Sequence, residues 1–212
     1  MNKSIYSLVL MDDVVQAVDR EAYRLGTSRS NLINQILAEH LCCVTPEMRM
    51  KQIFASISDL LEGSFQIRQQ NSDSLLTICT ALQYKYKPTV NYKVELLRSP
   101  DTYIGQLKVQ IRTQSSAVLK LFESFFSFWT ELEAEILSQK IETITFSLSD
   151  GKFTRILYNT NIPDELLGEA IHAYIALLDK TIKLYFSDNI GFKNEIPMIY
   201  NAYLAQTQKF II

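Results

Sequence analysis

A change of hydrophobic period within the first 41 residues constrains the fold of this chain more than any other feature of its sequence. Residues 5–10 alternate between two faces, which is the two-residue period of a short strand. Apolar residues then recur at spacings of three and four, which predicts an amphipathic helix that ends at Gly26. A second helix is predicted to run to Leu41, because Thr27 or Ser28 can cap it and an apolar stripe follows.

A strand and two short helices bury too little apolar surface to be stable alone, so we expect this unit to pair with a second copy. The simplest pairing is a two-fold dimer in which the two strands form an antiparallel ribbon across four interlocked helices. One ribbon face would pack on the helices through Tyr6, Leu8 and Leu10. The other face would be free, and a two-stranded ribbon fits into the major groove of DNA.

The residues that build this unit resemble a known family. The run from Tyr6 to Val15 and the run from Leu25 to Ile33 are similar to the ribbon-helix-helix family of DNA-binding proteins, the class of Arc- and MetJ-like repressors. The resemblance implies that the ribbon contacts bases through Lys3, Ile5, Ser7 and Val9. It also implies a phosphate site at Thr27, Ser28, Arg29, Ser30 and Asn31. The free amides and the dipole at a helix start independently favour an anion there.

Two properties of this segment depart from the family's pattern. Ile5 and Val9 can contact thymine methyl groups but cannot hydrogen-bond to guanine. Residues 1–44 carry four Lys and Arg against five Asp and Glu, a net charge of 4 − 5 = −1. Because phosphate neutralisation dominates nonspecific affinity, we expect modest DNA binding with a shallow salt dependence. The alternative interpretation is a dimerisation domain without a role in DNA binding.

The composition of the whole chain is that of a globular protein with room for a second, larger domain, since 47% of its 212 residues are hydrophobic and 21% are charged. The net charge of −2 gives no overall attraction to nucleic acid or to an anionic membrane, so any DNA contact must be local. No membrane span or secretion signal is recognisable, and the three cysteines lack a CxxC spacing. We therefore expect a cytoplasmic protein with reduced thiols and no membrane partner.

Pro46 predicts a boundary between residues 1–44 and a second domain of residues 45–212. Hydrophobic periods in the second domain predict helices over 46–62, 115–139, 163–186 and 195–208, and strands over 75–82, 90–97, 107–111, 143–148 and 152–158. This order predicts an α+β domain with a mainly antiparallel sheet and helices on one face. Such a domain would set higher oligomers, or bind a small effector or a partner protein.

Two features of the second domain each have a functional and a structural interpretation. Lysines and arginines in the predicted strands interleave with Tyr84, Tyr86 and Tyr92, which indicates either a basic aromatic binding surface or, more simply, a solvated sheet face with cross-strand aromatic pairs. The aromatic residues of helix 115–139 indicate either the lining of a ligand pocket or, more simply, a core helix that is buried on more than one side.

The sequence contains no recognisable catalytic motif. His40 and His172 have no Cys, Ser or carboxylate at a suitable spacing, and no phosphate-binding glycine loop or metal-ligand cluster is visible. We therefore predict no enzyme activity, no catalytic residue, no metal site and no cofactor. The glutamates of helix 115–139 indicate a solvated face formed by Glu131, Glu133 and Glu135.

The leading hypothesis is a homodimeric, sequence-specific DNA-binding transcriptional regulator of the repressor type that places its ribbon in the major groove of double-stranded DNA. The alternative hypothesis is an antitoxin or a plasmid-maintenance accessory protein whose large domain binds a partner protein. A companion protein that copurifies in stoichiometric amount would favour the alternative.

Overall fold

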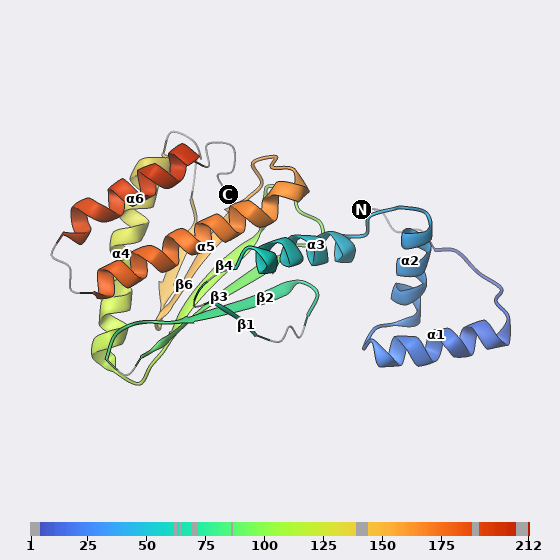
Figure 1. Cartoon of the computed structure of the whole chain (residues 1–212). Helices are drawn as coiled ribbons and strands as arrows, with labels where there is room; N and C mark the ends of the chain where they lie inside the picture. The colour runs from blue at the N-terminus through green and yellow to red at the C-terminus, as the bar shows by residue number, and fades with distance from the viewer. Residues whose placement is uncertain are drawn as a thin grey trace. The chain divides into compact units, whose positions relative to one another are not determined.

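The computed structural model describes residues 5–61, 63, 65–68, 72–85, 87–138, 144–187, 191–206 and 212 (Figure 1). The chain divides into two compact units, Met1–Arg49 and Met50–Ile212. The division falls within helix α3 (Pro46–Asp59), five residues after the expected end of the first domain (49 − 44 = 5).

The N-terminal unit contains two helices at the positions that the sequence predicts, α1 (Asp12–Arg24) and α2 (Arg29–His40). Gly26 follows α1 with φ +62°, a conformation that costs little for a residue without a Cβ. The Thr27 amide donates back to the Ala22 carbonyl at 2.9 Å, which closes the turn as a Schellman motif. The turn is therefore short, and α2 begins directly after it.

The second unit is built on a six-stranded antiparallel sheet whose strand order is β1-β2-β3-β4-β6-β5. The strands are β1 (Gln66–Arg68), β2 (Leu75–Ala81), β3 (Thr89–Leu96), β4 (Tyr103–Arg112), β5 (Phe146–Ser149) and β6 (Lys152–Tyr158). The prediction of an α+β fold with an antiparallel sheet is confirmed. The strands predicted over 75–82, 90–97 and 107–111 are present as β2, β3 and β4, and they are preceded by a short edge strand, β1, that the sequence analysis did not predict.

Helices α4 (Ser116–Leu137) and α5 (Asp164–Phe186) pack on one face of this sheet, as the sequence predicts (Figure 1). Phe126 of α4 stacks on Phe153 of β6 with ring centroids 4.1 Å apart. Helix α3 packs against α5 at Gly168, where an added Cβ would lie 2.6 Å from the Ser56 side chain. None of the helices in the described part of the chain is both long and apolar enough to cross a membrane.

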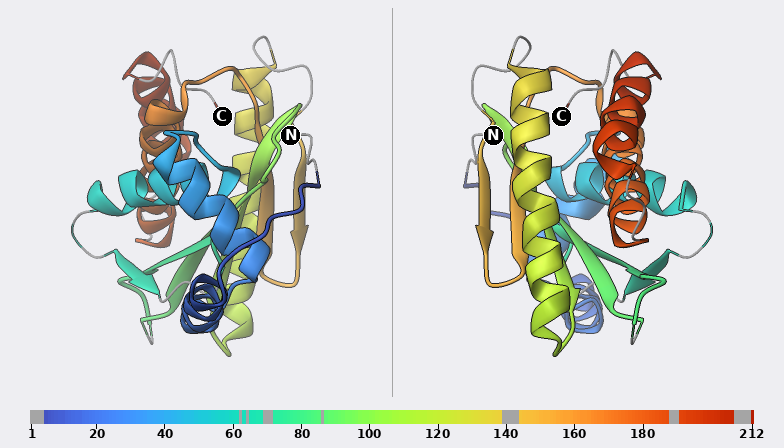
Figure 2. Two further views of the ribbon diagram at one scale, coloured as in Figure 1. Left: turned by 90° about the vertical axis from the view of Figure 1, so that its right-hand side faces the viewer. Right: turned by 90° about the vertical axis from the view of Figure 1, so that its left-hand side faces the viewer.

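Helix α4 is enclosed on two sides, which confirms its interpretation as a core helix. Figure 2 shows α4 with the β5–β6 strands on one side and with α5 and α6 (Phe192–Gln206) on the other. Phe125 of α4 packs edge-on against Tyr185 of α5, and Phe128 packs edge-on against Phe192 of α6. The aromatic side chains of α4 therefore fill the interior.

The prediction that Tyr84, Tyr86 and Tyr92 lie on an exposed sheet surface is wrong for the two of them that the structure describes. Tyr92 points into the helical layer, where its hydroxyl donates to Asp179 at 3.1 Å. Burial, together with the nearby carboxylate, raises the pKa of Tyr92 well above its ordinary value, so the hydroxyl keeps the proton that it donates. Tyr84 packs edge-on against Phe186 of α5, and Tyr86 lies outside the described residues.

A fully buried polar cluster lies within the helical layer, centred on Glu133 of α4. Its carboxylate pairs with Arg155 of β6 at 3.0 Å and accepts hydrogen bonds from Trp129, Tyr174 and Tyr200 at 3.1, 2.8 and 3.1 Å. The side chains of Glu133 and Arg155 are 0% and 1% exposed. The prediction that Glu133 lies on a solvated face is therefore wrong, because Arg155, Tyr174 and Tyr200 reach it from elements that are distant in sequence.

The buried charges of this cluster depend on each other. Burial acts to lower the pKa of the Arg155 guanidinium, but the Glu133 carboxylate and the neighbouring tyrosines Tyr174, Tyr200 and Tyr203 together outweigh burial and raise that pKa. Arg155 therefore stays charged inside the protein, and it needs Glu133 as its counterion.

Replacement of Glu133 is expected to destabilise the second unit. Glu133→Gln removes the counterion of a buried guanidinium, and breaking such a pair typically costs about 3–5 kcal/mol. Denaturant unfolding followed by the fluorescence of Trp129 measures the change. Glu131→Gln, on the same helix but exposed, is the matched control and should change stability by less than about 0.5 kcal/mol. Equal stabilities of the two variants would contradict the expectation.

Candidate nucleic-acid interface

Residues 5–10 form an extended segment before α1, and they are not part of the sheet that the structure describes (Figure 1). The predicted outward side chains of Ile5 and Val9 are fully exposed, and Ser7 is also exposed. The predicted inward side chains become progressively more covered toward α1, from 84% exposure at Tyr6 to 59% at Leu8 and 39% at Leu10. All six side chains of the segment are thus exposed in the single chain, and the strand expected over these residues is not formed within one copy.

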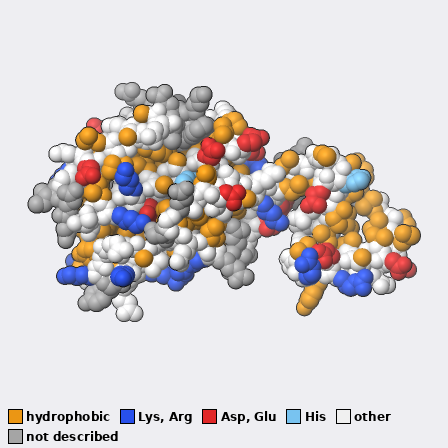
Figure 3. Space-filling view, in the orientation of Figure 1, with side chains coloured by type: hydrophobic (Ala, Val, Ile, Leu, Met, Phe, Trp, Pro, Cys, Tyr) orange, Lys and Arg blue, Asp and Glu red, His pale blue; other side chains and the backbone are white. Residues whose placement is uncertain are grey.

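The N-terminal unit does not complete a core within one chain. Among the described residues of both helices, Ala22, Leu32 and Ala38 are the buried apolar side chains. Thirteen of the eighteen large apolar side chains that are exposed in the described part of the chain belong to residues 5–44. Figure 3 shows hydrophobic side chains gathered on the visible surface of this unit. A single N-terminal unit thus leaves many of its large apolar side chains in contact with water.

The five predicted phosphate-binding residues lie together around the start of α2. The Ser28 hydroxyl caps the helix by accepting a hydrogen bond from the Asn31 amide at 3.2 Å. The Asn31 side chain donates to the Thr27 hydroxyl at 2.9 Å. Ser28, Arg29 and Ser30 are exposed. The geometry brings exposed side chains to the positive end of a helix dipole, which is a suitable arrangement for an anion.

An acidic side chain that the sequence reasoning did not include also reaches this helix start. Arg29 donates to the carboxylate of Asp19 on α1 at 2.7 Å, and the two residues form an ion pair. No short-range spacing indicates this contact, because ten residues separate its partners. A phosphate at the start of α2 would compete with Asp19 for the Arg29 guanidinium.

A second exposed ion pair further reduces the free positive charge of this unit. Arg24 donates to the Glu21 carboxylate, and this hydrogen bond lowers the pKa of Glu21 below its ordinary value. Within residues 5–44, Arg20 is the cation that makes no ion pair with a described residue. The composition of residues 1–44 predicts little positive charge for binding phosphate, and the ion pairs of Arg24 and Arg29 reduce it further.

The predicted base-facing residues are placed in part. Ile5, Ser7 and Val9 are exposed on the extended segment 5–10, whereas Lys3 lies outside the described residues. Among the described residues, no group of three or more His, Cys, Asp or Glu side chains is arranged to hold a metal ion. Comparison of the chain with protein-family models, with curated proteins and with solved structures gives no match.

Removal of the Asp19 carboxylate is expected to strengthen nonspecific DNA binding. Asp19→Asn frees the Arg29 guanidinium for a phosphate, so the slope of log affinity against log salt should steepen by about 1. Fluorescence anisotropy of a labelled duplex at several salt concentrations measures this slope.

Glu39→Gln removes the same charge from an exposed position of α2 and serves as the matched control. If both variants shift the slope equally, general charge rather than the Asp19–Arg29 contact limits binding.

Proposed function

We propose that this protein is a homodimeric, sequence-specific DNA-binding regulator of transcription. In the proposed dimer, residues 5–10 of two copies pair as an antiparallel ribbon, and this ribbon enters the major groove of double-stranded DNA. The observation that supports the proposal is the exposed segment 5–10, whose sequence alternates as a strand does, which pairs with no strand among the described residues and which lies on a unit with an incomplete core.

Pairing of two copies would give residues 5–10 a partner strand and would complete the core of the N-terminal unit. The backbone groups of residues 5–10 would gain hydrogen-bond partners, and their inward side chains would be covered by the helices of both copies. The apolar stripe of α2 remains exposed in one chain at Ile36, Leu37 and Leu41, and it would contribute to the same interface. Burial of such side chains contributes roughly 1.5–3 kcal/mol each.

The exposed side of the proposed ribbon determines what it can distinguish on DNA. Ile5 and Val9 offer apolar contacts that suit thymine methyl groups, and the Ser7 hydroxyl can donate or accept a hydrogen bond. The starts of the two α2 helices would bind phosphates and fix the position of the ribbon in the groove. We therefore expect a preference for A·T-containing operators and modest affinity for other sequences.

The two faces of the segment should respond differently to a polar substitution. Leu8→Asn places an amide on the face that is expected to be buried between copies, so it should shift the protein toward monomer. Val9→Asn places the same amide on the outward face and should leave the dimer intact. Sedimentation equilibrium of both variants and of the wild type measures the dissociation constant of the dimer. A wild-type protein that remains monomeric at micromolar concentration would contradict the proposal.

DNA binding should separate into a phosphate contribution and a base contribution. Arg29→Ala is expected to lower affinity for all duplexes to a similar degree, whereas Val9→Asn should change which sequence is preferred. Selection from a random duplex library, followed by gel-shift titration of the selected and unselected duplexes, measures both effects. Unchanged affinity and unchanged preference in both variants would rule out the ribbon as the DNA contact.

A further inference from the structure

Among the described residues of the second unit, the helices lie on one face of the sheet and none of them covers the other face. Side chains alternate between the two faces of each strand, and helices α3, α4 and α5 lie on the face that carries Tyr92 and Phe153. We call the opposite side the open face. Its charged residues in the described strands are Arg68, Lys93, Glu95, Lys108, Arg112 and Lys152.

The open face is much more basic than the chain as a whole. Its strand positions carry five cations and one carboxylate, a net charge of 5 − 1 = +4. The whole chain carries −2, so all other positions together carry −2 − 4 = −6. Positive charge is therefore concentrated on this one surface.

The register of the strands brings like charges together on the open face. Lys93 of β3 lies directly opposite Lys108 of β4, an arrangement that is unfavourable without an anion nearby. Glu95 neutralises Lys108, with both carboxylate oxygens 2.8 Å from the ammonium. Lys93 forms no ion pair with the described residues, and neither do Arg112 and Lys152.

The neutral residues between these cations are polar, and this favours binding of a phosphate backbone over binding of another protein. Thr77, Gln110 and Thr154 lie directly opposite the basic residues and offer neutral hydrogen-bond donors. A protein interface normally has an apolar core, but the centre of this face is polar. Its aromatic residues, Tyr103 and Tyr158, are at one end, so the face provides no central platform on which bases could stack.

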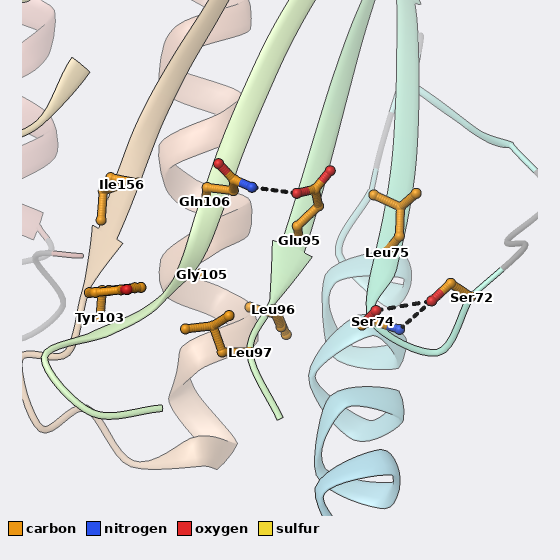
Figure 4. Close-up of a pocket in the computed structure, with 10 residues that line it drawn as sticks. All are labelled: Ser72, Ser74, Leu75, Glu95, Leu96, Leu97, Tyr103, Gly105, Gln106 and Ile156. Carbon is orange, nitrogen blue, oxygen red and sulfur yellow. Dashed lines mark hydrogen bonds between the residues drawn. The ribbon is translucent and has the colours of Figure 1, made fainter. Parts of the chain in front are cut away.

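A shallow hollow marks the end of the basic region. It has a volume of about 430 Å³ and includes Leu75, Glu95, Gln106 and Ile156 from four neighbouring strands (Figure 4). Within its lining, Glu95 accepts a hydrogen bond from the Gln106 side chain. Because Glu95 already pairs with Lys108 and much of the lining is apolar, this end offers no excess positive charge, so the anion-binding part of the open face is the part around Lys93, Arg112 and Lys152.

We propose that the open face binds the phosphate backbone of duplex DNA without regard to base sequence. The choice of DNA as the polyanion rests on the proposed function, whereas the basic surface itself does not involve the N-terminal unit. The face would add a second, electrostatic contact to the DNA whose sequence the ribbon distinguishes. This contact would also compensate for the net negative charge of residues 1–44.

The test compares two triple variants of the full chain. The face variant is Lys93→Gln, Arg112→Gln and Lys152→Gln. The control variant is Lys120→Gln, Lys180→Gln and Lys193→Gln, which removes three exposed lysines from the helices. Fluorescence anisotropy with a labelled duplex of random sequence measures the slope of log affinity against log salt. The face variant should lose about 3 from this slope, since each phosphate contact contributes about 0.9.

Two further measurements separate this inference from the ribbon proposal. In the Arg29→Ala background the face variant should lose the same part of the slope, even if the ribbon itself does not contact DNA. The preference for a selected operator over random duplex should be unchanged in the face variant. Equal slopes in the face and control variants would overturn the inference, as would displacement of the duplex by polyglutamate at the same charge concentration, which would indicate an acidic protein as the partner.

Discussion

The apolar side chains of residues 5–41 that one chain cannot cover are the constraint on which the rest of the interpretation depends. The N-terminal unit is well defined locally, with a Schellman turn at Gly26 and a Ser28 cap, yet it buries few large side chains. Local hydrogen bonds fix helix ends but contribute little free energy compared with burial of apolar surface. A unit with this balance is expected to gain its stability from a partner, and a second copy is the simplest one.

The second unit differs from the N-terminal unit because it buries a large apolar core within one chain. Helices α3, α4 and α5 cover one face of the sheet, and the interior contains the Glu133–Arg155 ion pair with its tyrosine and tryptophan donors. A buried ion pair of this kind is weak evidence for stability, since an apolar replacement of the same shape often does as well. Its geometry requires β6, α4, α5 and α6 to meet in one arrangement, and it therefore favours a single packing of the helical layer.

The two units distribute charge in a way that suits a shared DNA ligand. In the N-terminal unit, acidic residues hold Arg24 and Arg29 in ion pairs, and this limits nonspecific attraction to phosphate. In the second unit, the open face concentrates positive charge although the chain as a whole is slightly acidic. Sequence discrimination and electrostatic affinity would then come from different surfaces of one protein.

Local sequence patterns were sufficient to predict the helices of the N-terminal unit, the turn at Gly26 and the α+β order of the second unit. These features follow from periods and caps that span only a few residues. The pairing of Arg29 with Asp19, the burial of Glu133 beside Arg155 and the position of Lys93 opposite Lys108 became visible only in the folded chain. Each of these contacts joins residues that are ten or more positions apart, and a local period indicates which side of an element is apolar but not which distant side chain will face it.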